Sequence, residues 1–417
     1  MKILIVNKFL HPNGGSETYI FEIGKCLKSM GHEVEYFGME HEGRIVGNHA
    51  EIYTKDMDFH SSGLKGKLSK LTYPFKIIRS REAYSKMRSV LNAFHPDVVH
   101  FNNINFQLTP AVIEAVADYD IKNRTETKML YTAHDAQWVC PNHLLTKPDG
   151  KICFECKGCR YINCVKHKCI HGSLIRSLLG AVEAKYYHVR KTYDLIDCII
   201  APSKYIGDIL ESDPVLNGKV KVLHNFIVDK EDEDGATSET DDQSTGVNTG
   251  DGRKYALFFG RYSTDKGIGT LLECIKRLPD IDFIFAGSGP LESDINALDN
   301  IENRGFTRGK ALKDLISGAA FTVFPPEEPE NCPFTVMESI SYGTPVIGSD
   351  LGGTSELITD GVNGILFKAG DADALTGNIR RLWDDEALCK TLTRGCEQTH
   401  FMNVSEYCEE LINIYSH

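Results

Sequence analysis

Long hydrophobic runs are missing from this sequence. Hydrophobic residues make up 41% of its 417 residues, yet no uninterrupted apolar stretch approaches the roughly 20 residues that a membrane-spanning helix needs. The apolar residues at positions 3–6 are followed by Asn7, Lys8 and His11 before a signal-peptide core could form. We therefore expect a cytoplasmic protein whose chain begins with a β-strand.

Two further signals are absent. No Gly-x-Gly-x-x-Gly sequence follows the first predicted strand, and Gly287-Ser288-Gly289 is too short a match to support a nicotinamide-dependent oxidoreductase. The chain also lacks a basic excess, because its formal net charge is -12. We accordingly expect no nucleic-acid partner.

The negative charge is concentrated in one segment. Residues 229–252 hold nine acidic residues against one base, Lys230, and contain no aromatic residue. Outside this segment 49 acids face 45 bases, so the rest of the chain carries only -4. The composition predicts a solvated, disordered acidic loop. A regulatory or partner-binding segment is the alternative.

The length favours two domains of about 200 residues each. Apolar, β-branched runs alternate with helical patterns, which predicts an α/β fold with two doubly wound, Rossmann-like domains facing each other across a cleft. The predicted strands cover residues 2–6, 34–37, 98–101, 128–132 and 197–201, then 255–259, 282–286, 321–324, 345–348 and 364–367. We place the domains at 1–226 and 227–401, and expect a helix at 402–417 to pack back on the first.

Ligands of open parallel sheets bind at the carboxyl ends of the strands, so the residues after each strand are candidates for function. These residues are Gly14-Gly15-Ser16, His134-Asp135, Arg261 to Lys266, Gly287-Ser288-Gly289 and Glu330 to Glu338. Arg261 and Lys266 offer two cations to a polyanion, Arg as a bidentate fork and Lys as a point charge. They could stabilise the charge on a departing nucleoside diphosphate, which a divalent metal does elsewhere.

Two glutamates flank a predicted helix start. Pro333 suits a first helical position, which puts Glu330 in the preceding loop and Glu338 in the second turn. Amides at such a helix start can bind a diphosphate without a metal, and the carboxylates can accept hydrogen bonds from sugar and ribose hydroxyls. Taken alone, such a pair is more often solvated surface than a site.

Together these motifs resemble the family-four retaining glycosyltransferases of GT-B fold. The resemblance covers most of the chain, from Gly14-Gly15 through the Glu-x7-Glu stretch and residues 341–356 to residues 360–367. The combination is specific, although each motif alone is weak. It implies transfer of a sugar from a nucleotide-diphosphate sugar to a glycan or lipid-linked acceptor, in surface polysaccharide or glycoconjugate biosynthesis. No catalytic metal is implied; the first domain would bind the acceptor and the second the donor.

The resemblance also implies roles for single residues. Glu338 would hold the ribose hydroxyls, Glu330 the donor sugar, and Arg261 with Lys266 the diphosphate. Gly14 and Gly15 would let phosphate and acceptor approach the backbone. The remaining donor contacts would come from Gly287, Phe306, whose backbone would meet the base, and the stretch Asn331, Cys332, Pro333, Phe334 and Thr335.

His134 matches the family's histidine that touches the donor sugar near the reacting carbon, although a lone histidine after a strand is more often a core residue. In retaining GT-B enzymes the favoured mechanism is front-face attack, in which the leaving phosphate oxygen takes the acceptor proton. No nucleophile is then required, and we expect His134, Glu330, Arg261 and Lys266 to act in catalysis. The alternatives are a sugar-nucleotide epimerase or hydrolase of this fold and a non-catalytic sugar-nucleotide binder.

Other glycosyltransferases chelate a cation with an Asp-x-Asp pair. This spacing occurs at Asp56/Asp58, Asp280/Asp282 and Asp371/Asp373. None of these pairs follows a predicted strand in the setting that a metal site needs, so chance is the preferred interpretation.

Six of the 13 cysteines fall in an insert at residues 140–171, namely Cys140, Cys153, Cys156, Cys159, Cys164 and Cys169. Their two-residue spacings in a cytoplasmic protein favour metal over disulfides. A structural zinc ion would fold an insert that has little core of its own. Reduced or disulfide-linked cysteines are an equal alternative, and an iron–sulfur cluster is a minor one.

Residues 60–92 hold eight bases and one acid, Glu82, with apolar residues interleaved. This composition suits an anionic membrane surface or a lipid-diphosphate acceptor, each base contributing about 1 kcal/mol. Peripheral contact with the inner membrane face is one interpretation. An ordinary solvated helix face is the equal alternative.

Overall fold

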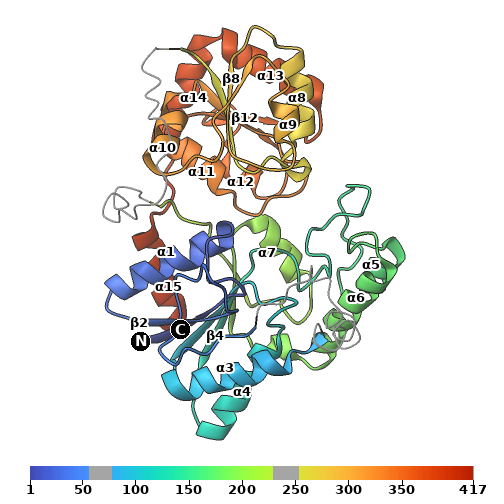
Figure 1. Ribbon diagram of the computed structural model, residues 1–417, viewed down its shortest axis with the longest axis vertical. Coiled ribbons are helices and arrows are strands. Elements are labelled where there is room, and N and C mark those ends of the chain that lie inside the picture. Colours follow the sequence, from blue (N-terminus) through green and yellow to red (C-terminus); the bar gives the residue numbers. More distant parts are fainter. Residues whose placement is uncertain (56–77, 229–252, 417) are drawn as a thin grey trace. The chain divides into compact units, whose positions relative to one another are not determined.

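The computed structural model describes residues 1–55, 78–228 and 253–416 (Figure 1). The chain divides into two compact units, of which the first contains Met1–Asn225 with Val404–His417 and the second contains Phe226–Asn403. Each unit is built around its own six-stranded sheet. The predicted acidic loop at 229–252 and most of the basic stretch at 60–92 lie outside the described residues.

The sheet of unit 1 is parallel throughout and has the order β2-β1-β3-β4-β5-β6. Its strands are β1 (Lys2–Val6), β2 (Glu33–Phe37), β3 (Val98–Phe101), β4 (Lys128–Thr132), β5 (Cys198–Ala201) and β6 (Val220–Val222). The chain leaves β1 toward β2 and returns to β3 on the other side of β1. The order therefore reverses between β1 and β3, and doubly wound folds bind ligands at such a switch point.

The helices of unit 1 are α1 (Gly15–Ser29), α3 (Arg81–Phe94), α4 (Ala111–Asn123), α5 (Ile162–His167), α6 (Leu174–Val189), α7 (Lys204–Glu211) and α15 (Val404–Ser416), with a 3-10 turn η1 (Thr192–Leu195). Serine side chains cap α3, α6 and α7, each accepting a hydrogen bond from the amide three residues on. The C-terminal α15 packs on α1, where Tyr407 Oη lies 3.0 Å from Tyr19 Oη. The last helix of the chain is thus part of the first unit.

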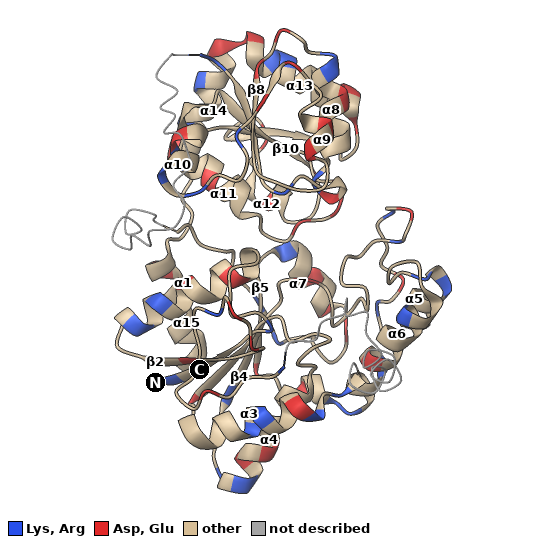
Figure 2. Ribbon diagram, viewed as in Figure 1, with Lys and Arg blue, Asp and Glu red and all other residues tan. Residues whose placement is uncertain are grey.

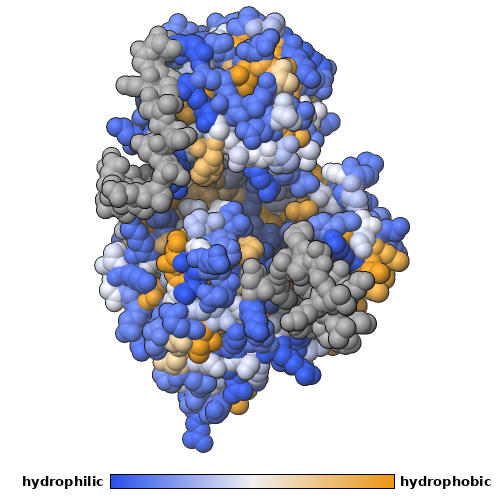
Figure 3. All heavy atoms as spheres, in the orientation of Figure 1, coloured by the Kyte–Doolittle hydropathy of each residue, from blue (hydrophilic) through white to orange (hydrophobic). Residues whose placement is uncertain are grey.

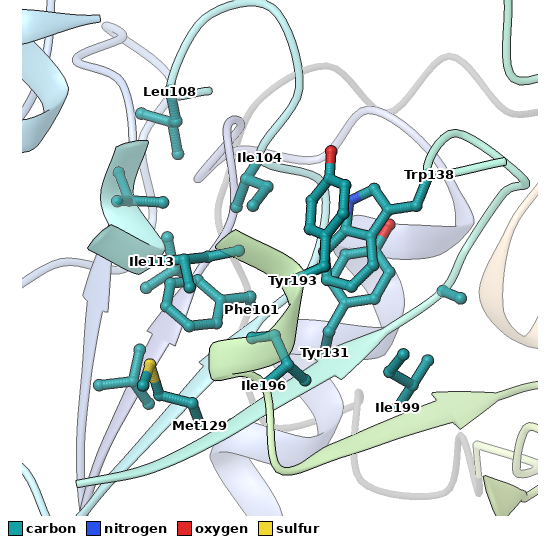
Figure 4. Packing of buried hydrophobic residues seen from close by; sticks show 14 of the residues in the cluster. Phe101, Ile104, Leu108, Ile113, Met129, Tyr131, Trp138, Tyr193, Ile196 and Ile199 are labelled. Carbon is teal, nitrogen blue, oxygen red and sulfur yellow. The ribbon is translucent and has the colours of Figure 1, made fainter. Parts of the chain in front are cut away.

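An aromatic stack anchors the segment after β4 to the core of unit 1 (Figure 4). The ring of Trp138 lies between Tyr131 and Tyr193, with centroids 3.8 and 4.3 Å away. All three side chains are buried, and such pairs add about 0.5–1.5 kcal/mol each beyond their burial. The chain that enters the cysteine insert is therefore fixed at its start.

The sheet of unit 2 is also parallel and has the order β12-β11-β10-β7-β8-β9. Its strands are β7 (Ala256–Phe259), β8 (Phe283–Ala286), β9 (Ile301–Asn303), β10 (Phe321–Phe324), β11 (Val346–Ser349) and β12 (Gly364–Phe367). The two central strands β7 and β10 are buried along their whole length, as expected where helices cover both faces. The order reverses between β7 and β10, which defines a second switch point.

The helices of unit 2 are η3 (Thr264–Lys266, a 3-10 turn), α8 (Ile268–Lys276), α9 (Glu292–Ile295), α10 (Gly309–Gly318), α11 (Phe334–Ser341), α12 (Thr354–Leu357), α13 (Ala372–Asp384) and α14 (Glu386–Gln398). Asp371 and Asp385 cap α13 and α14. None of the helices in the described part of the chain combines the length and apolar character that crossing a bilayer demands.

Candidate functional site

The turn after β7 is shaped by glycine. Gly267 has φ of +69°, and a Cβ there would lie 1.8 Å from the carbonyl oxygen of Pro325. Only glycine fits this position, because a side chain would meet fixed backbone in a left-handed conformation. The amide of Glu327 also donates to the carbonyl of Asp265 at 3.2 Å. The cationic turn after β7 is therefore locked against the segment that follows β10, across the switch point.

This packing brings three of the predicted site residues into two ion pairs. Lys266 Nζ contacts Glu330 Oε1, although 64 residues separate them in sequence. Arg261 pairs with Asp265 at 3.0 Å and donates from Nε to Ser263 Oγ at 3.2 Å. Lys266 is 24% exposed and Arg261 66%. Two cations and two carboxylates thus gather at one edge of the sheet.

Glu330 is held by its backbone as well. Its carbonyl accepts a hydrogen bond of 2.7 Å from the amide of Gly353, and its backbone bridges Gly352. A Cβ at Gly352 would lie 2.5 Å from the Glu330 carbonyl oxygen, so this approach also depends on glycine. Nearby, burial raises the pKa of Glu328, and the charges of Asp265 and Glu330 add to the effect. The position of Glu330 is therefore set by the fold.

Helix α11 begins one residue later than the sequence indicated. Pro333 is the N-cap, with ψ of 119°, and Phe334 is the first helical residue. The amides of Phe334 and Thr335 belong to the first turn, where an α-helix offers no internal acceptor. Glu338 lies in the second turn, as predicted, and is half-buried; Cys332 is buried and Asn331 is half-buried.

The turns after β8 and β9 lie beside this group, because β7, β8 and β9 are neighbours in the sheet. Gly287 donates to the carbonyl of Gly305 at 2.7 Å, and a Cβ at Gly287 would lie 1.9 Å from the Gly260 carbonyl oxygen. Phe306 follows Gly305 and is 74% exposed. An exposed aromatic residue therefore lies at the same edge of unit 2 as the ion pairs.

In unit 1, Gly14 and Gly15 stand at the start of α1. Gly14 has φ of -177°, and a Cβ there would meet Glu17 at an ordinary 3.6 Å. Neither conformation nor crowding within the protein requires glycine at Gly14. A need for bare backbone there would have to come from a ligand.

The sequence reasoning selected Ser16 but missed its polar partners around this helix start. Asn7, directly after β1, donates to buried Glu17 at 3.0 Å, and Ser16 donates to the same oxygen at 3.0 Å. Asn103, just after β3, donates from its side chain to Ser16 at 2.8 Å and from its backbone to Asn7 at 3.0 Å. These residues also follow strands, so the rule that selected His134 could have found them.

His134 is half-buried, and burial lowers its pKa to about 3. The neutral ring is placed by Asn102, whose Oδ1 lies 2.9 Å from Nε2. Nε2 therefore carries the proton, and Nδ1 is left as an acceptor. The edge of the ring meets Tyr19, with centroids 5.1 Å apart at 74°.

Behind His134 lies a second buried histidine that the sequence analysis did not single out. His100 is fully buried, with its nitrogens 2.7 Å from Thr132 Oγ1 and 2.8 Å from Tyr415 Oη. Burial, with a smaller contribution from His134, lowers its pKa to about 3. Tyr19 joins Thr132 at 3.2 Å and Tyr407 at 3.0 Å. This network connects the ends of β3 and β4 to α15.

The structure does not bring the six predicted cysteines of the insert together. Five of them, Cys140, Cys153, Cys156, Cys164 and Cys169, line one cavity together with His167. Cys159 lies apart from this cavity, against His188 of α6 and Asp213. All 13 cysteines belong to the described part of the chain and are free thiols. Burial raises the pKa of Cys140 to about 11 and of Cys156 to about 12.

Two of the three Asp-x-Asp pairs fall in the described residues. Asp280 is paired with Arg380 through both carboxylate oxygens, at 2.7 and 2.5 Å. Asp371 caps α13, while Asp373 contacts Arg277 at 2.6 Å. These carboxylates therefore have structural partners of their own. Asp56 and Asp58 lie outside the described residues.

Comparison with known proteins gives two family matches and several relatives. The model of Glycosyltransferase Family 4 matches residues 13–231, and that of Glycosyl transferases group 1 matches residues 239–398. An uncharacterized glycosyltransferase of Methanocaldococcus jannaschii is 29% identical over 231 residues, 54% of this chain and 60% of that protein. A lipopolysaccharide core biosynthesis glycosyltransferase of Rhizobium meliloti is 25% identical over 58% of this chain and 68% of its own length.

Solved structures share the whole architecture. Sucrose-phosphate synthase from Thermosynechococcus elongatus has a TM-score of 0.66 at 17% identity, covering 100% of this chain and 98% of its own. HepE of Anabaena, solved in complex with UDP, has a TM-score of 0.64 at 16% identity, covering 100% of both chains. The predicted fold class, two Rossmann-like domains of GT-B type, is confirmed. The model of Glycosyltransferase Family 4 by itself matches more than half of the sequence. The protein therefore belongs to glycosyltransferase family 4.

Proposed function

We propose that this glycosyltransferase transfers a sugar from a nucleotide-diphosphate sugar to a glycan or lipid-linked acceptor, with donor binding in unit 2 and acceptor binding in unit 1. The observation that carries the proposal is the arrangement at the switch point of unit 2. There Lys266 contacts Glu330, just before the start of α11, and Arg261 of the same turn pairs with Asp265.

A diphosphate fits the charge of this group. Lys266 is paired with Glu330, and Arg261 with Asp265. A pyrophosphate can take both cations from these carboxylates, because exposed and half-exposed ion pairs contribute only about 0–1 kcal/mol. The amides of Phe334 and Thr335 add donors whose helix dipole favours an anion. Glu330, once released by Lys266, becomes an acceptor for sugar hydroxyls.

The proposed contacts with the ribose, the base and the sugar are inferred from where the residues lie. Half-buried Glu338 would bind the ribose hydroxyls, and the loop of Gly287 and Phe306 would hold the base. The family resemblance and the shared sheet edge support these assignments. In unit 1, the unprotonated Nδ1 of His134 is suited to accept a hydrogen bond from a sugar hydroxyl. A neutral histidine held by Asn102 orients a substrate without titrating near neutral pH.

We propose that the reaction retains the anomeric configuration. The bond between the anomeric carbon and the phosphate oxygen breaks, and the acceptor oxygen bonds to that carbon from the same face. The acceptor proton passes to the departing phosphate oxygen. Lys266 and Arg261 stabilise the charge on this oxygen. Proton NMR of the product tests the stereochemistry, and a product of inverted configuration would contradict it.

We also propose that catalysis needs no divalent cation, because the two cations and the helix start can supply the positive charge that a metal supplies in other enzymes. Turnover should then be unchanged after dialysis against EDTA. Loss of activity with EDTA and rescue by Mg²⁺ or Mn²⁺ would refute this part of the proposal.

A membrane surface is the proposed location of a lipid-linked acceptor. Along α6, Leu174, Ile175, Leu178 and Val182 are exposed by 54%, 71%, 49% and 43%. Residues 156–182 contain five bases and no acid, and Figure 2 shows Lys and Arg on and around α5. Figure 3 shows apolar side chains at the corresponding right edge of the molecule. An apolar row flanked by bases suits an anionic bilayer.

Vesicle sedimentation tests this surface. The full-length protein should bind vesicles containing phosphatidylserine more strongly than neutral phosphatidylcholine vesicles, and Ile175→Glu should weaken the binding. Exposed Ile121 on α4, at 80%, provides the matched control Ile121→Glu. Equal binding by Ile175→Glu and the control would remove α6 from the proposal.

A panel of nucleotide sugars tests the function itself. Thermal shift identifies the donor, and release of nucleoside diphosphate in the presence of candidate acceptors measures turnover. Glu338→Ala and Lys266→Ala should stay folded and lose release, whereas Lys390→Ala, which breaks a surface ion pair with Glu386, should keep it. Undiminished release from either site variant would overturn the site assignment. With donor alone, fast conversion would instead indicate an epimerase or hydrolase, and binding without any turnover a non-catalytic binder.

A further inference from the structure

Three possible metal ligands from separate segments of unit 1 converge at one point. Cys159 belongs to the insert, His188 to the last turn of α6, and Asp213 to the loop after α7. The Sγ of Cys159 lies 3.1 Å from His188 Nε2 and 3.4 Å from Asp213 Oδ2. One ligand atom from each residue falls within 4.8 Å of the others.

The 3.4 Å between the sulfur and the carboxylate oxygen is a spacing expected for two ligands of a small tetrahedral ion, and the 3.1 Å between sulfur and nitrogen is slightly shorter. A zinc ion bound at about 2.3 Å from sulfur and about 2.0 Å from nitrogen or oxygen places its ligand atoms roughly 3.3–3.6 Å apart. Both ring nitrogens of His188 are near the sulfur, because Nδ1 also lies 3.4 Å away. A rotation of the ring about the Cβ–Cγ bond would aim one nitrogen at an ion between the three groups.

The carboxylate of Asp213 is committed to this position by the fold. The residue is only 2% exposed, and its Oδ1 accepts the backbone amide of Val215 at 2.9 Å. That hydrogen bond fixes the plane of the carboxylate and leaves Oδ2 turned toward the Cys159 sulfur. Besides this amide, the carboxylate has the thiol of Cys159 as a partner, which is a weak hydrogen-bond donor. A cation would compensate the charge of the carboxylate far better.

We propose that Cys159, His188 and Asp213 bind one Zn²⁺ ion, with water as the fourth ligand. The thiol proton of Cys159 leaves to solvent on binding. One thiolate, one carboxylate and a neutral imidazole then balance the two positive charges of the ion, so the half-buried site carries no net charge. Mixed sulfur, nitrogen and oxygen ligands suit zinc better than magnesium or calcium, which prefer oxygen alone.

The site would join the insert to the body of unit 1. A bond through Cys159 ties the insert to both α6 and the loop before β6, two elements of the main fold. The five-cysteine cavity, by contrast, is lined by residues of the insert and its entrance alone. The proposed ion therefore positions the insert, and it has no part in the donor chemistry of unit 2.

Zinc titration of the full-length protein tests the proposal. After chelation and reduction, Zn²⁺ is titrated against a chromogenic chelator, and Co²⁺ serves as a spectroscopic substitute. Cys159→Ala and His188→Ala should each lose one equivalent of zinc, and Cys159→Ala should also lose the thiolate-to-cobalt absorption of that equivalent. The control Cys164→Ala removes a thiol of the cavity and should retain that equivalent. Circular dichroism confirms that each variant is folded.

Asp213→Asn tests the contribution of the negative charge alone. The amide oxygen can still accept the hydrogen bond from Val215, but the charge is removed. The substitution should weaken zinc binding at least about 10-fold, as loss of a charged ligand or its support generally does. The proposal is overturned if the wild-type protein takes up no zinc. It is equally overturned if Cys159→Ala binds as the wild type does, or if zinc is lost only in Cys164→Ala.

Discussion

Both units are built on a six-stranded, parallel, doubly wound sheet, although their strand orders differ, and they hold their polar residues at the switch point in different ways. In unit 2 the backbone sets the positions: Gly267 and Gly352 allow close approach to Pro325 and Glu330, and the charged side chains then pair at the surface. In unit 1 hydrogen bonds between side chains set the positions, as between His134 and Asn102. The first arrangement leaves charges available for exchange with a ligand, whereas the second fixes orientation.

The largest expected effect concerns the charges of unit 2. Lys266→Ala should reduce turnover about 100- to 1,000-fold, the usual range for removing one group that stabilises developing charge. Arg261→Ala should cost less, about 10-fold, because Arg261 is 66% exposed and Lys266 is 24% exposed. Steady-state kinetics measures both. A larger loss of turnover in Arg261→Ala than in Lys266→Ala would show that Lys266 does not make the larger contribution to catalysis.

Backbone geometry is tested next. Gly267→Ala should destabilise unit 2 by roughly 2–3 kcal/mol, because the new methyl meets the Pro325 carbonyl at positive φ. Gly269→Ala in the same region is the matched control: nothing lies within 4 Å of its Cβ, and alanine should stabilise helix α8 slightly. Urea unfolding measures the difference. Equal stability of the two variants would show that the turn is not held by this contact.

The buried network of unit 1 predicts a dependence on pH. The pKa of His100 falls from 6.5 to about 3 on folding. Below pH 6.5, His100 is therefore protonated in the unfolded chain but stays neutral in the folded protein. Stability should therefore fall as pH falls from 6.5 toward 3, by about 2 kcal/mol at pH 5 from this residue. His100→Gln should lessen the slope. An unchanged slope, measured by urea unfolding between pH 5 and 7, would contradict the account of His100.

The smallest effect on folding is expected at Gly14. Its extended φ of -177° and open surroundings let alanine fit, so Gly14→Ala should cost no more than about 1 kcal/mol, mainly through a poorer N-cap. If the bare backbone serves a ligand, substrate affinity should fall while stability hardly changes. A thermal shift comparable to that of Gly267→Ala would show that glycine at this position has a structural role after all.

The sequence was most informative about central strands. Ten strands of the described residues were predicted to within two residues at each end, namely the eight inner strands and the edge strands β2 and β12. The inner strands are the clearest, because buried parallel strands read as continuous apolar runs. The edge strands β6 and β9 were not counted as strands; each has three residues, none of them fully buried. Short, half-exposed edges carry no comparable pattern.

Candidate site residues could be selected from the sequence because they follow strands, but the residues that contact them could not. Lys266 and Glu330 lie 64 residues apart, and their contact depends on β10 pairing with β7, which no local pattern reveals. Asn102 follows a predicted strand and could have been selected by the same rule as His134. The separation of Cys159 from the other cysteines depends on His188 and Asp213, which have no spacing signal.

Calorimetric titration of nucleoside diphosphates, with EDTA present, tests the central claim most directly. The cognate diphosphate should bind the wild-type protein, and Lys266→Met should abolish most of that affinity while leaving the weak binding of the nucleoside unchanged. If the diphosphate binds both proteins equally well, Lys266 does not grip the pyrophosphate and the assignment of the donor site to this edge of unit 2 is wrong.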